Sequence, residues 1–258
     1  MELRETFNTV AELYDRARPT YPDELYDDLR TLTGRGPGAD VLEIAPGTGK
    51  ATVALARRGY NVTGVELGAE LAAVARRNLA AFPGSTIEVA RFEDWDPAGR
   101  TFDLVCCATA FAWLDPAVRL QRCAKVLRSG GYLAIWSNEH VDGGSTEFFP
   151  ESQDCYERWM PGTPPGLRCE PPEAFADKSW ALDQTADFDA PQFRRYFWTL
   201  PYTTESYLDV LRTYSGHIAL EEPNQSRLYE CIARLIDSKY GGHIEKAYLT
   251  QLTVARRR

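Results

Sequence analysis

The sequence predicts an α/β fold in which a parallel sheet is covered by helices on both faces. Between residues 41 and 136, short apolar segments suited to buried strands alternate with helical segments, a pattern typical of parallel sheets. A glycine-containing turn joins the first strand to the next helix, and the second strand ends in a carboxylate. The 258 residues, 44% of them apolar, suffice for one α/β domain with an inserted segment.

The first strand-turn-helix unit predicts a site for a nucleoside cofactor. The strand at 41–44 runs into Gly47 and Gly49, and the second strand ends at Glu66, 17 residues after Gly49. Glycines let the backbone approach a ligand, and the helix N-terminus presents unpaired N–H groups. A carboxylate at the tip of the second strand can accept hydrogen bonds from both ribose hydroxyls.

The glycine spacing separates two cofactor classes that share this geometry. A dinucleotide site requires a third glycine where this chain has Thr52. The segment instead resembles motif I of the class I S-adenosylmethionine (SAM)-dependent methyltransferases, with Glu43, Gly47 and Gly49 matching and Ala45 in place of the first glycine. The alternative for the loop alone is a tight turn without a ligand.

Later segments extend the resemblance through about residue 140. Residues 87–95 resemble the third strand and the acidic loop that holds adenine, 102–113 the fourth strand and the loop facing the methyl donor, and 126–136 the fifth strand with its Gly-Gly turn. The resemblance implies a Rossmann-like, seven-stranded, mostly parallel sheet of order 3-2-1-4-5-7-6.

Residues 7–22 resemble the leader of the small-molecule branch of that family, in which an Arg-Pro pair lies over the cofactor. Arg18 is our candidate for gripping the methionine carboxylate, because a guanidinium can bind it through two hydrogen bonds. Tyr14 lies one helical turn earlier on the same face. The alternative is that both residues only pack a surface helix against the sheet.

The resemblance thus implies a set of cofactor-binding residues along the chain. Arg91 stands where the family usually has an aspartate, and an arginine cannot accept a hydrogen bond from adenine. The acceptor must then be Glu93, Asp94, a backbone carbonyl or water, with Glu93 first, although the two acids can also form a solvated turn. The candidates are Tyr14, Arg18, Glu43, Ala45, Pro46, Gly47, Gly49, Glu66, Leu67, Phe92, Glu93, Ala108 and Phe111.

The catalytic candidates are His140 and Trp113. SAM supplies the electrophile and the leaving group, so the protein has mainly to align the acceptor and exclude water. Related enzymes often have a histidine just before the tryptophan after strand four, where this chain has Ala112. His140 is therefore the first candidate base and His217 the second, and either can instead be a surface or capping histidine.

The chain divides into four expected segments. Residues 1–39 form a helical cap over the cofactor, 40–140 the SAM-binding core, and 141–190 a proline- and aromatic-rich lid of irregular structure. Residues 191–258 supply strands six and seven, expected at 193–200 and 247–256, with helices at about 204–214 and 224–239 between them.

Composition excludes several classes of partner. A formal charge of -8 argues against a nucleic-acid backbone, and no apolar run is long enough for a membrane span. The six cysteines show no metal-ligand spacing, so no metal is expected. They indicate reduced thiols and a cytoplasmic protein. The oligomeric state is not readable from the sequence.

The sequence thus predicts an enzyme that transfers a methyl group from SAM to a small molecule, for which an aromatic natural product is one possibility. Aromatic residues at 111, 113, 159, 180 and 198 can line a site for such an acceptor or belong to the core. The alternatives are an enzyme that binds SAM without transferring methyl, for example to promote a rearrangement, a non-enzymatic SAM-binding module, and a nicotinamide oxidoreductase.

Overall fold

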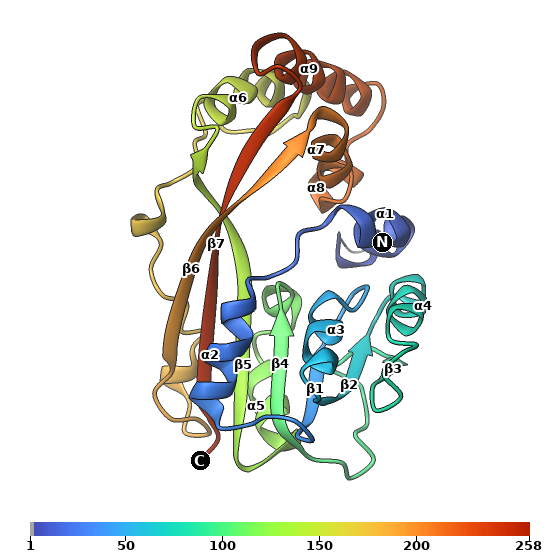
Figure 1. Cartoon of the computed structure of the whole chain (residues 1–258), viewed down its shortest axis with the longest axis vertical. Helices are drawn as coiled ribbons and strands as arrows, with labels where there is room; N and C mark the ends of the chain where they lie inside the picture. Colours follow the sequence, from blue (N-terminus) through green and yellow to red (C-terminus); the bar gives the residue numbers. More distant parts are fainter. Residues whose placement is uncertain (1–2) are drawn as a thin grey trace. The chain divides into compact units, whose positions relative to one another are not determined.

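A computed structural model describes residues 3–258 and contains one seven-stranded sheet (Figure 1). Its strand order is β3-β2-β1-β4-β5-β7-β6, as the resemblance implied. Parallel pairing joins β3 to β2, β2 to β1, β1 to β4 and β4 to β5. The strands are β1 (Asp40–Ile44), β2 (Asn61–Glu66), β3 (Thr86–Val89), β4 (Phe102–Ala108), β5 (Leu127–Gly144), β6 (Gln192–Thr203) and β7 (His243–Arg256).

Helices precede β1 and lie in each connection between consecutive strands except the one from β3 to β4. The α-helices are α1 (Ala11–Ala17), α2 (Asp23–Thr33), α3 (Lys50–Arg57), α4 (Ala69–Asn78), α5 (Arg119–Val126), α6 (Phe148–Trp159), α7 (Thr204–Leu211), α8 (Ser215–Ile218) and α9 (Asn224–Lys239). Short 3-10 helices are η1 (Leu3–Val10), η2 (Phe111–Trp113), η3 (Pro172–Ala174) and η4 (Leu182–Gln184). None of the helices within residues 3–258 is both long and apolar enough to cross a membrane.

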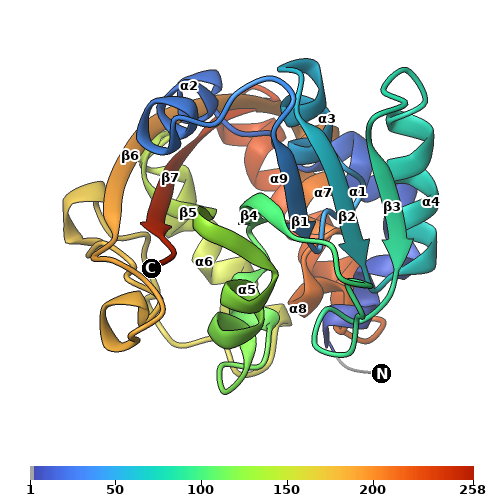
Figure 2. The same cartoon turned by 90° about the horizontal axis from the view of Figure 1, so that it is seen from below.

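Alternating residues of the central strands pack on opposite faces of the sheet. Val41 of β1 packs in one cluster with residues of α2 and α3, whereas Leu42 packs in another with residues of α5. Figure 2 shows β1, β2 and β3 side by side, with α3 and α4 beside them. Because the strands of a parallel sheet are buried on both faces, they read as continuous apolar runs in the sequence.

The chain forms two compact units, and the division falls inside the three longest strands. Unit 1 comprises the N-terminal segment through Arg18, Glu139–Ala176 and Phe197–Leu249. Unit 2 comprises Pro19–Asn138, Asp177–Tyr196 and Thr250–Arg258. The four segments expected from the sequence do not coincide with this division, since residues 1–39 and 141–190 each contribute to both units.

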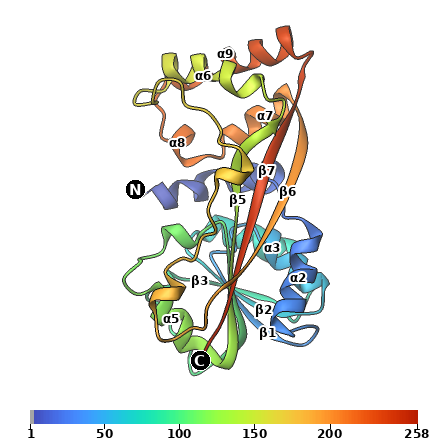
Figure 3. The same ribbon diagram turned by 90° about the vertical axis from the view of Figure 1, so that its left-hand side faces the viewer.

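The segment at 141–190 is more regular than the sequence indicated. β5 continues to Gly144, and α6 forms a 12-residue helix whose buried residues include Phe148 and Cys155. In unit 1, α6 packs against α9, as Figures 1 and 3 show. The many prolines suggested irregular structure, but Pro150 falls in the first turn of α6, where the missing N–H costs no helical hydrogen bond.

The prediction that all six cysteines are reduced is wrong in this structure. A disulfide joins Cys155 of α6 to Cys231 of α9, which lie 76 residues apart in the sequence. Cys106, Cys107, Cys123 and Cys169 are free. Spacing in the sequence gives no sign of this pair, because the packing of two distant helices brings the two sulfurs together.

Candidate functional site

Glu66 organises the turns at the ends of β1 and β2 in unit 2. Its side chain is 5% exposed. The Gly47 amide donates to Oε2 and the Gly68 amide to Oε1, each at 2.8 Å. Burial raises the pKa of Glu66, and the amides of Gly68, Gly47 and Leu67 oppose that shift. A carboxylate has about four acceptor positions, so these two bonds leave it able to accept others.

The turn after β1 depends on residues with left-handed backbone conformations. Ala45, Gly47 and Gly49 have φ angles of +52°, +59° and +85°. A Cβ atom on Gly49 would lie 3.3 Å from the Cβ of Ala75, so both φ and packing favour glycine there. Ala45 adopts this conformation despite its methyl group, which explains why glycine is the family's usual residue at that position.

Pro46 completes the turn by packing closely against β2. A Cβ atom on Gly64 would lie 2.9 Å from Pro46 Cγ and 2.5 Å from Ile87 Cδ1. Gly64 therefore lets the turn and β3 approach β2. Sequence reasoning did not single out Gly64, although an isolated glycine inside a strand often marks such a close approach.

Glu43 of β1 precedes the same turn by two residues and is fully buried. Within the described part of the chain, neither carboxylate oxygen has a hydrogen-bond partner, and the hydroxyls of Thr48 and Thr52 are also without one. Burial raises the pKa of Glu43 to about 7; the nearby Thr52 hydroxyl opposes this shift and the Glu66 charge adds to it. Glu43 is thus a buried carboxyl group with a raised pKa, two residues before the predicted cofactor turn begins at Ala45.

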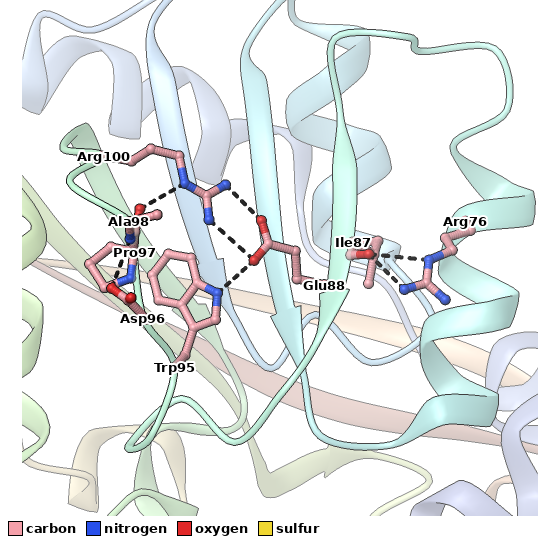
Figure 4. A network of polar contacts seen from close by, with 8 residues as sticks. All are labelled: Arg76, Ile87, Glu88, Trp95, Asp96, Pro97, Ala98 and Arg100. Carbon is pink, nitrogen blue, oxygen red and sulfur yellow. Dashed lines mark hydrogen bonds and ion pairs between the residues drawn. The ribbon is translucent and has the colours of Figure 1, made fainter.

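The loop after β3 carries the predicted adenine-binding residues and is held by Glu88 (Figure 4). Oε2 of Glu88 accepts a 2.7 Å hydrogen bond from Trp95 Nε1, and Arg100 forms an ion pair of 2.6 Å with Oε1. Phe92 of this loop is 3% exposed. Glu93 accepts a hydrogen bond from the Asp115 amide, and Asp94 pairs with Arg91 at 3.8 Å.

The segment after β4 contains Ala108, Phe111 and Trp113. Ala108 is half-buried at the end of the strand, and Phe111 is almost completely buried, with the Arg119 guanidinium 4.6 Å from its ring centroid. Trp113 is 40% exposed. Thr109 has a φ of +59°, which is rare for a β-branched residue.

Tyr21 is a residue that sequence reasoning missed. Its hydroxyl lies 2.8 Å from Thr109 Oγ1, and its ring packs edge-on against Trp136. It belongs to the Arg18-Pro19-Thr20-Tyr21 stretch that carried the family resemblance. No periodicity or motif spacing in the sequence distinguishes this tyrosine, which lies between a threonine and a proline.

The remaining candidates, Tyr14, Arg18 and His140, belong to unit 1. Arg18 lies over the rings of Tyr14 and Tyr214, with its guanidinium carbon 5.1 and 4.4 Å from the ring centroids. It donates from Nη2 to the Thr213 carbonyl, while its buried Nε–H has no partner within residues 3–258. The guanidinium therefore keeps donors for an anion.

The two candidate bases lie in different surroundings within unit 1. His140 keeps exposed surface, and its Nε2 lies 3.3 Å from the Tyr214 hydroxyl. Desolvation by the surrounding protein atoms lowers the pKa of His140 well below its usual range, and the charges of Lys246 and Arg18 lower it further. The imidazole is therefore neutral near pH 7 and able to accept a proton.

His217 is 5% exposed and stacks on Tyr229 with ring centroids 5.9 Å apart. Burial lowers the pKa of His217 to about 4. Its buried Nδ1 has no partner among the described residues, and its Nε2 lies 3.4 Å from the Tyr156 hydroxyl. His217 is therefore a core histidine, which leaves His140 as the better candidate base.

Comparisons with known proteins identify one part of unit 2. Residues 41–131 match the family model described as a methyltransferase domain. An uncharacterized methyltransferase of Mycobacterium tuberculosis is 35% identical over 133 residues, which cover 51% of this chain and 52% of the relative. A demethylmenaquinone methyltransferase of Tropheryma whipplei is 28% identical over 148 residues, covering 54% and 60%. The match thus spans little more than half the length of these relatives.

A solved structure from Anaeromyxobacter dehalogenans, assigned as a type II methyltransferase, has a TM-score of 0.58 and 22% identity, covering 93% of this chain and 97% of that one. Residues 41–131 therefore form a methyltransferase domain. Its fold is that of the class I SAM-dependent methyltransferases, and SAM is the cofactor of that class.

Proposed function

We propose that this chain is an enzyme that transfers a methyl group from SAM to a small-molecule acceptor. The observation that carries the proposal is the Glu66 carboxylate, held by the amides of Gly47 and Gly68 at the tip of β2. This arrangement suits a nucleoside because the carboxylate is fixed in place, and its remaining acceptor positions match two ribose hydroxyls.

Residues of this chain suit the other parts of the cofactor. Arg18, with an unpartnered buried Nε–H, would bind the methionine carboxylate. The turn from Ala45 to Gly49 would approach the cofactor through its backbone, and the loop with Phe92 and Glu93 would hold adenine. When bound, SAM supplies a methyl group on a sulfonium, which is an electrophile with a good leaving group.

The contribution of the protein to the chemistry is then alignment and proton removal. His140 would accept a proton from an acceptor that loses one, since its imidazole is neutral near pH 7. Trp113, partly exposed after β4, would contact the acceptor. An acceptor without a transferable proton would require only positioning and exclusion of water.

A small-molecule acceptor is supported by one relative's name, since demethylmenaquinone methyltransferase names a small molecule. An aromatic acceptor is our finer proposal, based on the aromatic residues that the sequence contributes around 111–113 and in unit 1. The alternative, an enzyme that binds SAM without methyl transfer, is favoured by Ala112, which removes the usual histidine.

Two measurements test the proposal. Calorimetric titration should show saturable SAM binding, and incubation with methyl-labelled SAM and a panel of phenols, amines and carboxylic acids should label at least one acceptor. Binding of SAM without labelling across a broad panel would favour the alternative. Absence of SAM binding would refute both the proposed methyl transfer and the alternative.

A further inference from the structure

Lys246 of β7 is a buried cation that no carboxylate neutralises. It is 5% exposed and lies on the same face of the strand as Ile244 and Tyr248, which are also buried. Within residues 3–258, no aspartate or glutamate lies within 4.0 Å of its ammonium group; the described contacts of that group are with aromatic rings. Nζ lies 4.7 Å from the Phe149 ring centroid and 5.7 Å from that of Tyr248.

A buried ammonium group without a counterion is costly and therefore uncommon. Cation-π contacts offset only part of the lost hydration. Burial lowers the pKa of Lys246 to about 8, so most of the population is still charged at neutral pH. A cation kept in such surroundings suits an anion that arrives from solution.

The neighbours of Lys246 in unit 1 are aromatic rings and the His140 imidazole. His140 and Lys246 both contact the ring of Tyr248, with the two ring centroids of His140 and Tyr248 5.9 Å apart. The ring of Tyr214 also packs against His140, with the two ring centroids 5.4 Å apart. The Arg18 guanidinium lies over the same tyrosine ring.

Two further titratable groups lie near Lys246. Burial raises the pKa of the Cys169 thiol; Lys246 opposes that shift and Asp142 adds to it. Asp142 is exposed, and its Oδ1 accepts a hydrogen bond from the Gly143 amide instead of pairing with Lys246. Neither group supplies the missing counterion.

We propose that Lys246, together with His140 and the rings of Tyr214 and Tyr248, binds the carboxylate of an aromatic acid. The ammonium group would pair with the carboxylate, and His140 would donate or accept a further hydrogen bond. The half-buried Tyr214 would pack against the ring of the acid, while Tyr248, which is buried and stacked on Trp198, would hold Lys246 and His140 in place. The proposal goes beyond the proposed function, because it requires no methyl transfer. It also assigns an anion separate from the methionine carboxylate, for which Arg18 is the candidate.

The test is calorimetric titration of the whole chain with benzoate, 4-hydroxyphenylacetate and 2-naphthoate, each beside its neutral amide. At least one acid should bind about tenfold or more tightly than its amide, since a hydrogen bond to a charged group contributes that much. The Lys246→Met variant keeps an unbranched four-atom stem without the ammonium group and should lose this preference. The matched control is Lys239→Met, which removes an exposed lysine of unit 1 that pairs with Glu151.

Three results would overturn the proposal. The first is that no acid binds more tightly than its amide to the wild-type chain. The second is that Lys246→Met binds the acid as tightly as wild type does. The third is that saturating S-adenosylhomocysteine abolishes acid binding by competition. The third result would mean that the anion is the methionine carboxylate of the cofactor. The wild-type comparison of acid with amide decides the question even if Lys246→Met does not fold.

The same titrations separate this proposal from the proposed function. Loss of an unpaired buried charge should leave the melting temperature of Lys246→Met unchanged or raise it, and its affinity for S-adenosylhomocysteine should equal that of wild type. A chain that binds the acids but not the cofactor would refute the proposed function alone.

Discussion

The amide of Gly47 donates a 2.8 Å hydrogen bond to Oε2 of Glu66, so one carboxylate joins the turn after β1 to the end of β2. The Gly68 amide binds the other oxygen of the same group. The geometry of the predicted ribose site is therefore set by a contact between two neighbouring strands. Changes at Glu66 should alter both the affinity for a nucleoside and the shape of the turn.

Glu66→Ala should lower the affinity for SAM by tenfold or more, because up to two charge-assisted hydrogen bonds of roughly 1.5 to 3 kcal/mol each are lost. Calorimetry measures the affinity, and circular dichroism checks that the variant is folded. The exposed Glu24 of α2 provides the control variant, Glu24→Ala, which should bind like wild type. An unchanged affinity in Glu66→Ala would remove this residue from the cofactor site.

Ala45→Gly should stabilise the protein by about 0.5 to 1 kcal/mol. Ala45 has a φ of +52°, where a Cβ atom costs roughly 1 to 2 kcal/mol, and the greater entropy of glycine in the unfolded state offsets part of the gain. Urea unfolding gives the difference. Ala54→Gly in α3 is the opposite control, because there glycine should destabilise the helix by about 0.5 to 1 kcal/mol. Destabilisation by both variants would contradict the strain at Ala45.

Glu43 should make the protein less stable as the pH rises. Its pKa is about 7 in the folded chain and near 4.5 when exposed, so the folded state binds the proton more tightly. The stabilisation is complete below pH 4.5 and is lost as the pH rises through about 7, with a total on the order of 3 kcal/mol. The Glu43→Gln variant cannot lose a proton there, so the difference between the two unfolding curves isolates this group.

Urea unfolding of both proteins at intervals from pH 5 to pH 9 measures that difference. We expect wild type to lose stability relative to Glu43→Gln across this range, with most of the change below pH 8. Parallel curves for the two proteins would show that Glu43 does not titrate in this way.

The disulfide between Cys155 and Cys231 should be measurable and stabilising. Thiol titration of the denatured chain should give four thiols before reduction and six after it, since four of the six cysteines are free. Reduction, or the Cys155→Ser/Cys231→Ser variant, should lower the free energy of unfolding by roughly 2 to 4 kcal/mol. In a Cys169→Ser variant, which loses a free cysteine, reduction should still raise the number of titratable thiols by two. Six thiols without reductant would show that the bond does not form.

Much of the fold was predictable from the sequence because its signals are local. The buried strands 41–44, 62–66 and 102–108 read as apolar runs, and the strand order followed from the family resemblance. The helix expected at 224–239 has those bounds in the structure, and its apolar residues Leu228, Ile232 and Ile236 have helical spacing.

What the sequence did not reveal depends on contacts between distant segments. β7 begins at His243, four residues before the predicted start, because the polar residues there alternate with Ile244 and do not form an apolar run. Lys246 therefore lay outside the expected strand, although it is buried in β7. The Tyr21 contact with Thr109 joins residues 88 positions apart, and no local pattern could indicate it.

The division of the chain within β5, β6 and β7 also determines how the protein can be produced. Each of these strands begins in one unit and ends in the other, so no single cleavage of the polypeptide releases either unit with its strands intact. A fragment limited to residues 40–140 would lack the strands that continue the sheet beyond β5 and would expose the edge of β5 to aggregation. Recombinant expression and partial proteolysis should therefore be planned around the whole chain, with affinity tags at its ends.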